Sequence, residues 1–555
     1  MTDLLSGALS LVSALALSLG LGLLVAGKSD SRIQIEAVLS QGLLLLMILL
    51  GFLHFILPLS SVFAVALVSG LGGIGLFLYR EQLREFTTSF VFLAAATAFG
   101  LVYMSQATIT NYDPGLYYHS FVAFLRDDQI VLGLANLHSR LGNWSSSFAL
   151  SAWFENGPLG NEGYRLANPL LLLVVLLSLI GTFREVKRSQ ISPGFVIKVF
   201  GVGWVLAEFL TAPGFFIAAP TPDTGYALSS VMALASAIDM VWSSNLTSKY
   251  SALTWALISV FYRPQGFVVL FVVVLIWSFI ELGRRTGVPR NLGSRCGWRP
   301  AGLVIAGIVG YVMLAVALTG HPVYPVASLP KVFSWSVPSG RRSWLSDQIT
   351  WIARQGPLPE SVDFRGVGWI PDWAVRQSGL LLLVSLVVAG GATLSWRLTP
   401  PPRTPRFPVL WATTSLPVAV WFVLAPDPRF GLGPLAVFAI TPGVRWLKHG
   451  GSHSLEDSRD GVLFGASLTV FLLACLLPIA SEFGERVGAR VPLGIPEQTH
   501  LGTPQRIAAD LGSVVVTRPL NTSGPECGAS LWCTPEDASG LRVDTWGPFT
   551  VLSRD

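Results

Sequence analysis

The stretch LLSGALSLVSALALSLGLGLLV at residues 4–25 contains no charged side chain. A helix needs about 20 mostly apolar residues to cross the hydrocarbon core of a bilayer. A cleavable signal sequence begins with a basic segment and has a shorter apolar core, and this stretch has neither feature. We therefore predict that residues 4–25 form a membrane-spanning helix.

Apolar runs of similar length recur along the whole chain. Of its 555 residues, 52% are hydrophobic and only 12% are charged, whereas a soluble domain has about 25% charged residues. Lipid offers the backbone no hydrogen bonds, so these runs must be helical. The sequence thus predicts an all-α polytopic membrane protein with about 12–14 transmembrane helices. The predicted spans lie near 4–26, 37–57, 59–79, 87–107, 166–181, 195–218, 227–243, 250–262, 265–281, 301–319, 378–396, 407–425, 430–447 and 461–480.

Three of these segments, 166–181, 227–243 and 250–262, are short for a span. Helices that stop inside a membrane protein are tolerated where they are covered by protein or line a cavity. We interpret some of the three as broken or re-entrant helices.

Basic residues mark the short connections between the predicted spans. The positive-inside rule places such connections in the cytoplasm, and alternation of the spans satisfies all of the basic clusters together. The net charge of +5 therefore reflects membrane orientation and is not a signal for nucleic acid. The clusters are Arg80 and Arg84, Arg184 to Arg188, Arg284 to Arg299, Arg397 to Arg406, and Arg445 with Lys448.

The same alternation places nearly all of the complex sequence on the outer face, together with the short turns 220–225, 262–266 and 426–429. Polar residues therefore gather at one face. The predicted division of the chain is 1–105, N-terminal transmembrane helices; 106–165, a first large outer loop; 166–319, transmembrane helices; 320–377, an outer loop rich in Trp and Pro; 378–480, transmembrane helices; and 481–555, an outer C-terminal tail.

The C-terminal tail predicts a small β-rich cap. Val514-Val515-Val516 is a strand-forming run flanked by turn residues. Cys527 and Cys533 lie close together in the same tail. A disulfide between them is expected if the tail faces an oxidising space.

The outer loop 106–165 is the candidate active site. It contains NYDPGLYYH at residues 111–119, directly after a predicted span. There Asp113 would lie at the membrane surface, where a carboxylate can act as general base toward an acceptor hydroxyl. The alternative is that Asp113 caps a helix that begins at Pro114.

A second part of the loop, NLHSRLGNWSS at residues 136–146, is dense in hydrogen-bonding groups. Arg140 can bind a phosphate through its planar guanidinium. His138 can act as a neutral donor or acceptor, and His119 and Asn136 are further candidate binding residues. The alternative is a loop whose Asn and Ser side chains satisfy its own backbone.

Three outer turns carry further candidate binding residues, Asp223, Arg263, Asp427 and Arg429. A cation at the end of a span can bind a lipid phosphate and stabilise it as a leaving group. The alternative is that Arg263 only extends toward the interface, and that Asp427 and Arg429 form a structural pair.

No cofactor motif is evident in the sequence. It has no phosphate-binding loop, no dinucleotide fingerprint and no Cys/His cluster. The adjacent carboxylates Asp127-Asp128 could bind a divalent cation, although such a pair is more typical of a solvated helix end.

The outer-face residues resemble those of an uncharacterised family of bacterial membrane proteins related to the C-type fold of glycosyltransferases. DPGLY at 113–117 and GLANLHSRL at 133–141 carry the resemblance, with TGHPVYP at 319–325, PDPRF at 426–430 and the cysteines around Trp532. It extends from loop 106–165 to the C-terminus. In that family the histidine stands one place earlier, where this chain has Tyr118.

The resemblance implies a helical bundle of the C-type fold and a polyprenyl-phosphate-linked sugar as donor. It implies Asp113 as the catalytic base, with outer-face cations holding the lipid phosphate, in a multi-pass protein of the bacterial plasma membrane. The alternatives are a flippase for lipid-linked glycans and a polysaccharide polymerase or ligase. A transporter would show internal repeats and ionisable residues near the bilayer midplane, and the sequence has no repeat.

The predicted topology is tested by cysteine labelling of intact cells. A membrane-impermeant maleimide should label Gly340→Cys and not Arg290→Cys, because every basic connection then lies inside. Labelling at position 290 without labelling at position 340 would reverse the orientation.

Overall fold

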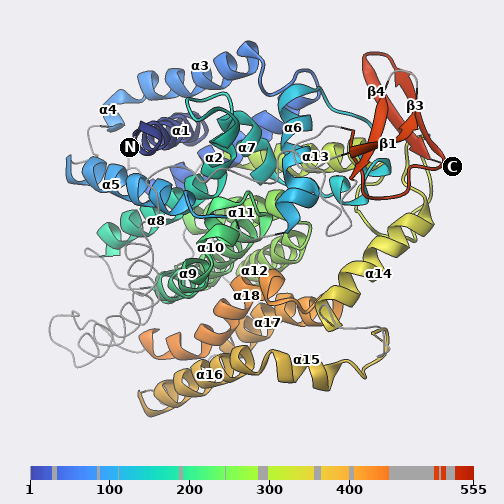
Figure 1. Cartoon of the computed structure of the whole chain (residues 1–555). Coiled ribbons are helices and arrows are strands. Elements are labelled where there is room, and N and C mark those ends of the chain that lie inside the picture. The colour runs from blue at the N-terminus through green and yellow to red at the C-terminus, as the bar shows by residue number, and fades with distance from the viewer. Residues whose placement is uncertain are drawn as a thin grey trace, which may run out of the picture.

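In the computed structural model, 76% of the described residues are helical, and most of the apolar segments lie in one bundle (Figure 1). Seven helices in the described part of the chain are long and apolar enough to cross a membrane, or eight if one bent pair counts as a span. The chain is therefore a multi-pass membrane protein. The structure describes residues 2–27, 34–83, 88–109, 112–186, 192–243, 246–285, 298–355, 364–398, 406–448, 505–511, 514–519 and 532–554.

All of the predicted spans up to residue 447 correspond to helices, and the one at 461–480 lies outside the described residues. Several of them are shorter than a full span, notably Val62–Leu78. The helices are α1 (Thr2–Ala26), α2 (Ile35–His54), α3 (Val62–Leu78), α5 (Thr88–Ser105), α8 (Ala167–Val186), α9 (Pro193–Thr211), α10 (Pro222–Ser243), α11 (Leu246–Tyr262), α12 (Gly266–Arg285), α13 (Trp298–Thr319), α16 (Ser378–Leu398), α17 (Arg406–Leu424) and α18 (Pro428–Ile440).

The three short segments, some of which we interpreted as broken or re-entrant, are all continuous helices, α8, α10 and α11. Their polar residues shortened the apolar runs in the sequence. In α10, 89% of the most apolar window is buried inside the protein, so its Ser and Asp side chains do not face lipid. The bend lies elsewhere, where α15 (Ile370–Arg376) meets α16 at 78°.

Helix packing in the bundle depends on small residues and on a central position for α10. That helix packs against α9, α11, α12 and α18. On the other side, α1 and α3 approach so closely that a Cβ on Gly75 would lie 2.0 Å from the carbonyl oxygen of Gly20. Such close contacts between small residues drive helix association in lipid. The outward side chains of α3 and α5, such as Phe63, Phe77 and Phe92, are exposed and apolar, as lipid contact requires.

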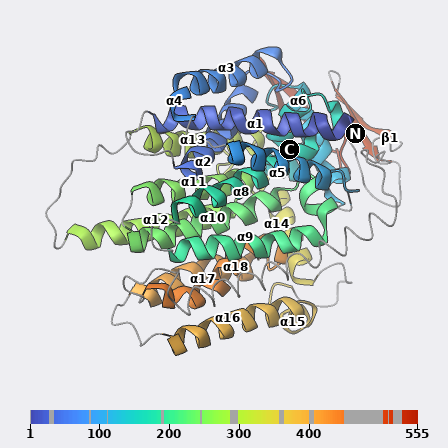
Figure 2. The ribbon, with the colours of Figure 1, turned by 90° about the vertical axis from the view of Figure 1, so that its left-hand side faces the viewer.

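The outer segments predicted from the sequence all fold at one end of the bundle. Loop 106–165 forms η1 (Pro114–Tyr118), α6 (His119–Asp127), η2 (Leu134–Asn136), η3 (Ser139–Gly142), α7 (Ser146–Phe154) and η4 (Gly160–Leu166). Loop 320–377 contributes α14 (Ser339–Gln355). The N-terminus and the C-terminal strands lie at this end, and α12 extends to the opposite end (Figure 2).

The C-terminal cap consists of two antiparallel hairpins. One pairs β1 (Gln505–Asp510) with β2 (Val515–Pro519), and the other pairs β3 (Leu541–Trp546) with β4 (Phe549–Arg554). Leu132 of the outer loop joins the second hairpin, since its N–H donates to the Thr550 carbonyl at 2.9 Å. Cys533 is disulfide-bonded, and Cys527 lies outside the described residues.

A second polar cluster lies at the opposite end of the bundle, which corrects the expectation that polar residues gather at one face. Lys198 of α9 donates to both carboxylate oxygens of Glu36 at 2.6 and 2.7 Å. Thr182 donates to Glu36 at 2.9 Å, and Ser236 and Ser251 lie at 3.4 and 3.3 Å. This network joins α2, α8, α9, α10 and α11 around one carboxylate.

The Glu36–Lys198 pair should stabilise the bundle measurably. Glu36→Ala leaves the ammonium of Lys198 buried without its partner, a change that typically costs about 3–5 kcal/mol. Unfolding by dodecyl sulfate in mixed micelles, followed by circular dichroism, measures the loss. The double variant Glu36→Ala/Lys198→Met should recover most of it. A single variant as stable as the native protein would show that the pair is dispensable.

Candidate functional site

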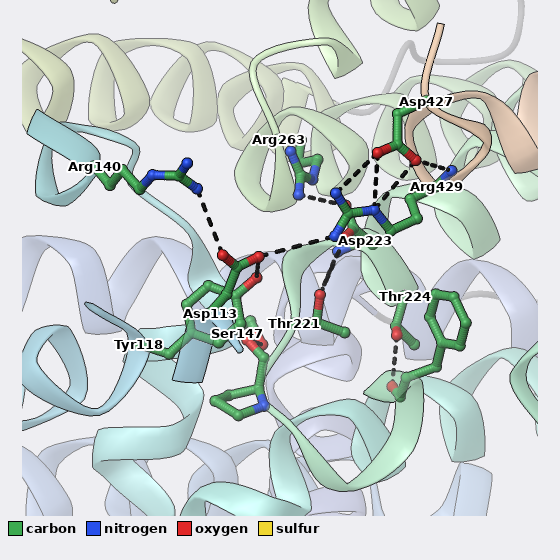
Figure 3. Close-up of polar contacts among 12 residues, drawn as sticks. Asp113, Tyr118, Arg140, Ser147, Thr221, Asp223, Thr224, Arg263, Asp427 and Arg429 are labelled. Carbon is green, nitrogen blue, oxygen red and sulfur yellow. Dashed lines mark hydrogen bonds and ion pairs between the residues drawn. The ribbon is translucent and has the colours of Figure 1, made fainter. Parts of the chain in front are cut away.

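Asp113 lies where the outer loop begins, and its side chain does not cap the helix that follows. The residue stands before η1 with Pro114 at the first helical position, as the sequence suggested, but it makes no side-chain capping hydrogen bond. Its carboxylate instead faces two arginines and a tyrosine (Figure 3). The hydroxyl of Tyr118 donates to Asp113 Oδ2 at 3.4 Å. The capping alternative therefore does not account for this carboxylate.

The two arginines come from distant parts of the chain. A guanidinium nitrogen of Arg140, in η3, lies 3.5 Å from Asp113 Oδ1. A nitrogen of Arg429, in the first turn of α18, lies 3.9 Å from Asp113 Oδ2. Both distances are long for a charge-assisted hydrogen bond, which is about 2.7–2.9 Å. Asp113 is thus held loosely between two cations.

Arg429 is positioned by its own turn. Asp427 caps α18, accepting from the backbone N–H of Arg429 at 3.0 Å, and Pro428 occupies the first helical position. The same carboxylate accepts from the Arg429 side chain at 2.9 Å. The structural pair considered from the sequence is present, and it also directs Arg429 toward Asp113 (Figure 3).

Arg263 is fixed by a buried carboxylate. It follows the last residue of α11 and forms an ion pair with Asp223, in the first turn of α10. Asp223 is only 1% exposed. The Arg263 guanidinium also lies 4.5 Å from the ring centre of Phe430, in cation–π range.

These side chains form one six-charge cluster of three aspartates and three arginines. Its formal charges cancel, which limits the cost of removing them from water. The members are Asp113, Arg140, Asp223, Arg263, Asp427 and Arg429.

Two cavities meet at this cluster. The inner cavity, of about 150 Å³, extends toward Arg263 and is walled by aromatic residues including Trp144, Phe148 and Tyr262. The outer cavity, of about 750 Å³, lies between loop 106–165, α14 and the cap. Asp113, Arg140 and Arg429 line both cavities. A group bound in either cavity would therefore contact these three side chains.

The inner cavity is lined by buried polar atoms that lack hydrogen-bond partners among the described residues. They are the Tyr262 hydroxyl, Arg263 Nε, Gln265 Oε1 and Trp144 Nε1. Buried polar groups are nearly always paired, with protein or with water. Four such atoms therefore belong to residues around one small cavity, although each of the four is itself almost fully covered by protein.

His138 and Asn136, singled out from the sequence, have different roles in the fold. His138 lines the outer cavity, with its Nε2 atom 3.8 Å from a carboxylate oxygen of Glu536. Burial, reinforced by the charges of Arg140 and Arg341, lowers the pKa of His138 to about 3, so its imidazole is neutral. Asn136 is buried and donates to the backbone carbonyls of Trp335 and Leu552, which makes it a structural link.

The remaining candidates lie apart from the cluster. His119 packs edge-on against Tyr164, at 4.8 Å between ring centres, and lines neither cavity. Arg126 binds Asp127, and also Glu155 at 2.8 Å. Within the described residues, no three His, Cys, Asp or Glu side chains are grouped in a way that could hold a metal ion.

Sequence reasoning missed the far wall of the outer cavity. Glu536 of the cap accepts from the backbone N–H of Ser139 at 2.9 Å, from the Ser139 hydroxyl, and from Arg341 of α14. Three segments that are hundreds of residues apart thus meet at one carboxylate. The only signal for this wall in the sequence was the concentration of Trp in loop 320–377, which includes Trp344.

The neutral state of His138 predicts a pH dependence of stability. The unfolded chain binds a proton below about pH 6.5, whereas folded His138 binds one only below about pH 3. This residue therefore favours unfolding as the pH falls from 6.5 toward 3. Between pH 7.5 and pH 5, the free energy of unfolding of the native protein should fall by about 2 kcal/mol more than that of the His138→Gln variant. Denaturant midpoints at both pH values measure the difference, and equal losses in the two proteins would contradict a buried neutral imidazole.

Comparisons with known proteins identify a family but no activity. A search of curated proteins finds no match, and a search of solved structures finds none. One family model matches residues 5–436, which cover most of the helical bundle and the whole six-charge cluster. The chain belongs to the family defined by this model, the domain of unknown function DUF8201.

Proposed function

We propose that the protein is an integral-membrane glycosyltransferase that uses a polyprenyl-phosphate-linked sugar as donor. The observation that supports this most strongly is the position of Asp113 at the junction of two cavities, between two arginines. We place it in a bacterial plasma membrane with the cluster on the outer face, and its helices in a bundle of the C-type fold.

The inner cavity suits the donor phosphate. Arg263 and Arg429 line it, and both stand at the ends of membrane helices, where a lipid headgroup arrives. Arginine binds phosphate oxygens in pairs through its planar fork.

Binding of the phosphate would change the partners within the six-charge cluster. The contacts of Asp113 with Arg140 and Arg429 are long, so a phosphate at the cavity junction competes well for both guanidinium groups. Asp113 then loses its cationic neighbours and becomes available to an acceptor hydroxyl. Donor binding would thus prepare the base.

The reaction follows from this arrangement. The acceptor hydroxyl transfers its proton to the Asp113 carboxylate as its oxygen bonds to the anomeric carbon of the donor sugar. The bond from that carbon to the phosphate oxygen breaks, and its electron pair leaves with the polyprenyl phosphate. The additional negative charge is stabilised by Arg263 and Arg429, because fixed cations act most strongly where charge develops.

A flippase for lipid-linked glycans is the second candidate. The buried Glu36–Lys198 pair provides ionisable residues within helices, but it lies at one end of the bundle and not near the midplane, where such a protein binds its substrate. However, Glu36 is bound by Lys198 and three hydroxyl groups, as expected for a structural network. A polymerase or ligase of surface polysaccharide would share the chemistry proposed for Asp113.

Two substitutions separate donor binding from chemistry. Arg263→Ala should abolish the thermal stabilisation that a polyprenyl monophosphate gives the purified protein, because the phosphate loses a fixed cation. Arg365→Ala is the matched control, since Arg365 is 72% exposed, forms an ion pair with Asp347 at the surface and lines neither cavity. Asp113→Asn should bind the lipid phosphate normally but release polyprenyl phosphate from a panel of polyprenyl-phosphate sugars about 10²–10⁴ times more slowly.

Normal turnover by folded Asp113→Asn would exclude a general base at this position. Loss of turnover together with lipid binding in that variant would assign Asp113 to the binding site instead. If the lipid stabilises Arg263→Ala and Arg365→Ala equally, the phosphate does not bind in the inner cavity.

A further inference from the structure

We infer that the outer cavity is a carbohydrate-binding subsite, which holds the end of a glycan acceptor against Asp113. The assignment of an acceptor rests on the proposed transferase function. The presence of a glycan subsite rests on the cavity itself. At about 750 Å³ it lies within the roughly 300–1,000 Å³ range of small-molecule sites.

The lining of the cavity matches a sugar better than a lipid or an apolar peptide. Of its lining residues, only Leu116, Ile352 and Pro535 are aliphatic or imino side chains. The others are aromatic, charged or amide-bearing. An acyl chain or an apolar peptide anchor would leave these charged and amide groups without partners, whereas sugar hydroxyls would meet donors and acceptors on several sides.

Two aromatic side chains at the cavity are unusually exposed. Tyr112 is 46% exposed and Trp344 is 49% exposed, and they come from the outer loop and from α14. An aromatic ring offers an apolar face, and its polar edge remains in contact with water. Such faces stack on the apolar face of a pyranose ring.

Two further polar side chains complete the subsite, and Arg518 lies close enough to Asp537 to interact with its charge. The side chains of Gln348, on α14, and Arg518, on β2, form no hydrogen bond within the described part of the chain. Gln348 presents both a donor and an acceptor, and Arg518 presents up to five N–H donors. One turn of helix separates Gln348 from Trp344, so the amide and the indole project from the same face of α14.

The far wall of the subsite is preformed. Glu536 is bound to Ser139 and Arg341 at once, which fixes the cap to both the outer loop and α14. A rigid wall reduces the entropy lost on binding. Since Asp113 and Arg140 form the boundary with the inner cavity, a sugar hydroxyl in the outer cavity would lie opposite the donor.

Photo-crosslinking in native membranes tests this inference without knowledge of the acceptor. The probe is p-benzoylphenylalanine, placed at Gln348 in the full-length chain. Ile305 is the matched control position, because it is 64% exposed on α13 and apolar. After irradiation, mass spectrometry of the purified protein should find a periodate-sensitive carbohydrate adduct at position 348 and phospholipid adducts alone at position 305.

Trp344→Ala in the position-348 background provides a second measurement. It should reduce the carbohydrate adduct about three- to tenfold, the effect of losing an aromatic contact. The same protein should keep its stabilisation by polyprenyl monophosphate, which reports on the inner cavity and on folding.

The outcomes distinguish this inference from the proposed function. Adducts at position 348 that contain only phospholipid or only protein, or that do not exceed the position-305 control, overturn the carbohydrate subsite even if lipid-phosphate binding depends on Arg263. If the protein gives a carbohydrate adduct but binds no polyprenyl phosphate, the transferase function is wrong. The cavity then binds a glycan that is not an acceptor.

Discussion

Charged side chains at the edge of a membrane are stable only when other charges or hydrogen bonds replace the water they lose. The six-charge cluster around Asp113 satisfies this constraint. Each of its ion pairs also fixes a chain segment: Asp223 holds the end of α11 against the start of α10. Asp113 brings the outer loop near α18 through a looser contact of 3.9 Å with Arg429. The positions of the helices and the shape of the two cavities therefore depend on the same charges.

A neutral cluster of this kind is well suited to binding an anion reversibly. Three unpaired arginines would bind phosphate tightly but would be costly to bury without it. Three arginines that are already paired can instead exchange one oxygen ligand for another of similar geometry. In the mechanism that we propose, the carboxylate displaced is the one with the longest contacts, Asp113, at 3.5 and 3.9 Å from its arginines. Asp427, which also receives a backbone hydrogen bond, would stay in place.

The helices were predictable from the sequence because hydropathy reports directly on burial in lipid, and segments such as 4–26 and 301–319 match their helices closely. The predicted helix bounds were wrong where a helix is surrounded by other helices and not by lipid. The extent of α10 was underestimated because its polar residues are buried against other helices. Glu36 and Lys198 gave no signal as a pair, since 162 positions separate them.

The candidate site was predictable in part for a related reason. Each acidic or basic turn could be recognised locally, but the sequence does not say which turns meet. Asp113, Arg140, Arg263 and Arg429 come together through the packing of the bundle. The wall formed by Glu536 was not predictable, because it depends on the docking of the cap against Ser139 and Arg341. Similarly, only tertiary packing distinguishes His138, at the cavity, from His119, against Tyr164.

The network around Glu36 has a consequence for how the protein is made. Glu36 leaves the ribosome 162 residues before Lys198, a delay of roughly 10–30 s at ordinary rates of synthesis. During that interval the carboxylate has no partner within the bundle, and hydrocarbon is a poor environment for it. Insertion of α8 to α11 supplies the partners of this carboxylate, so we expect the inner end of α2 to reach its final packing only after α11 has been made.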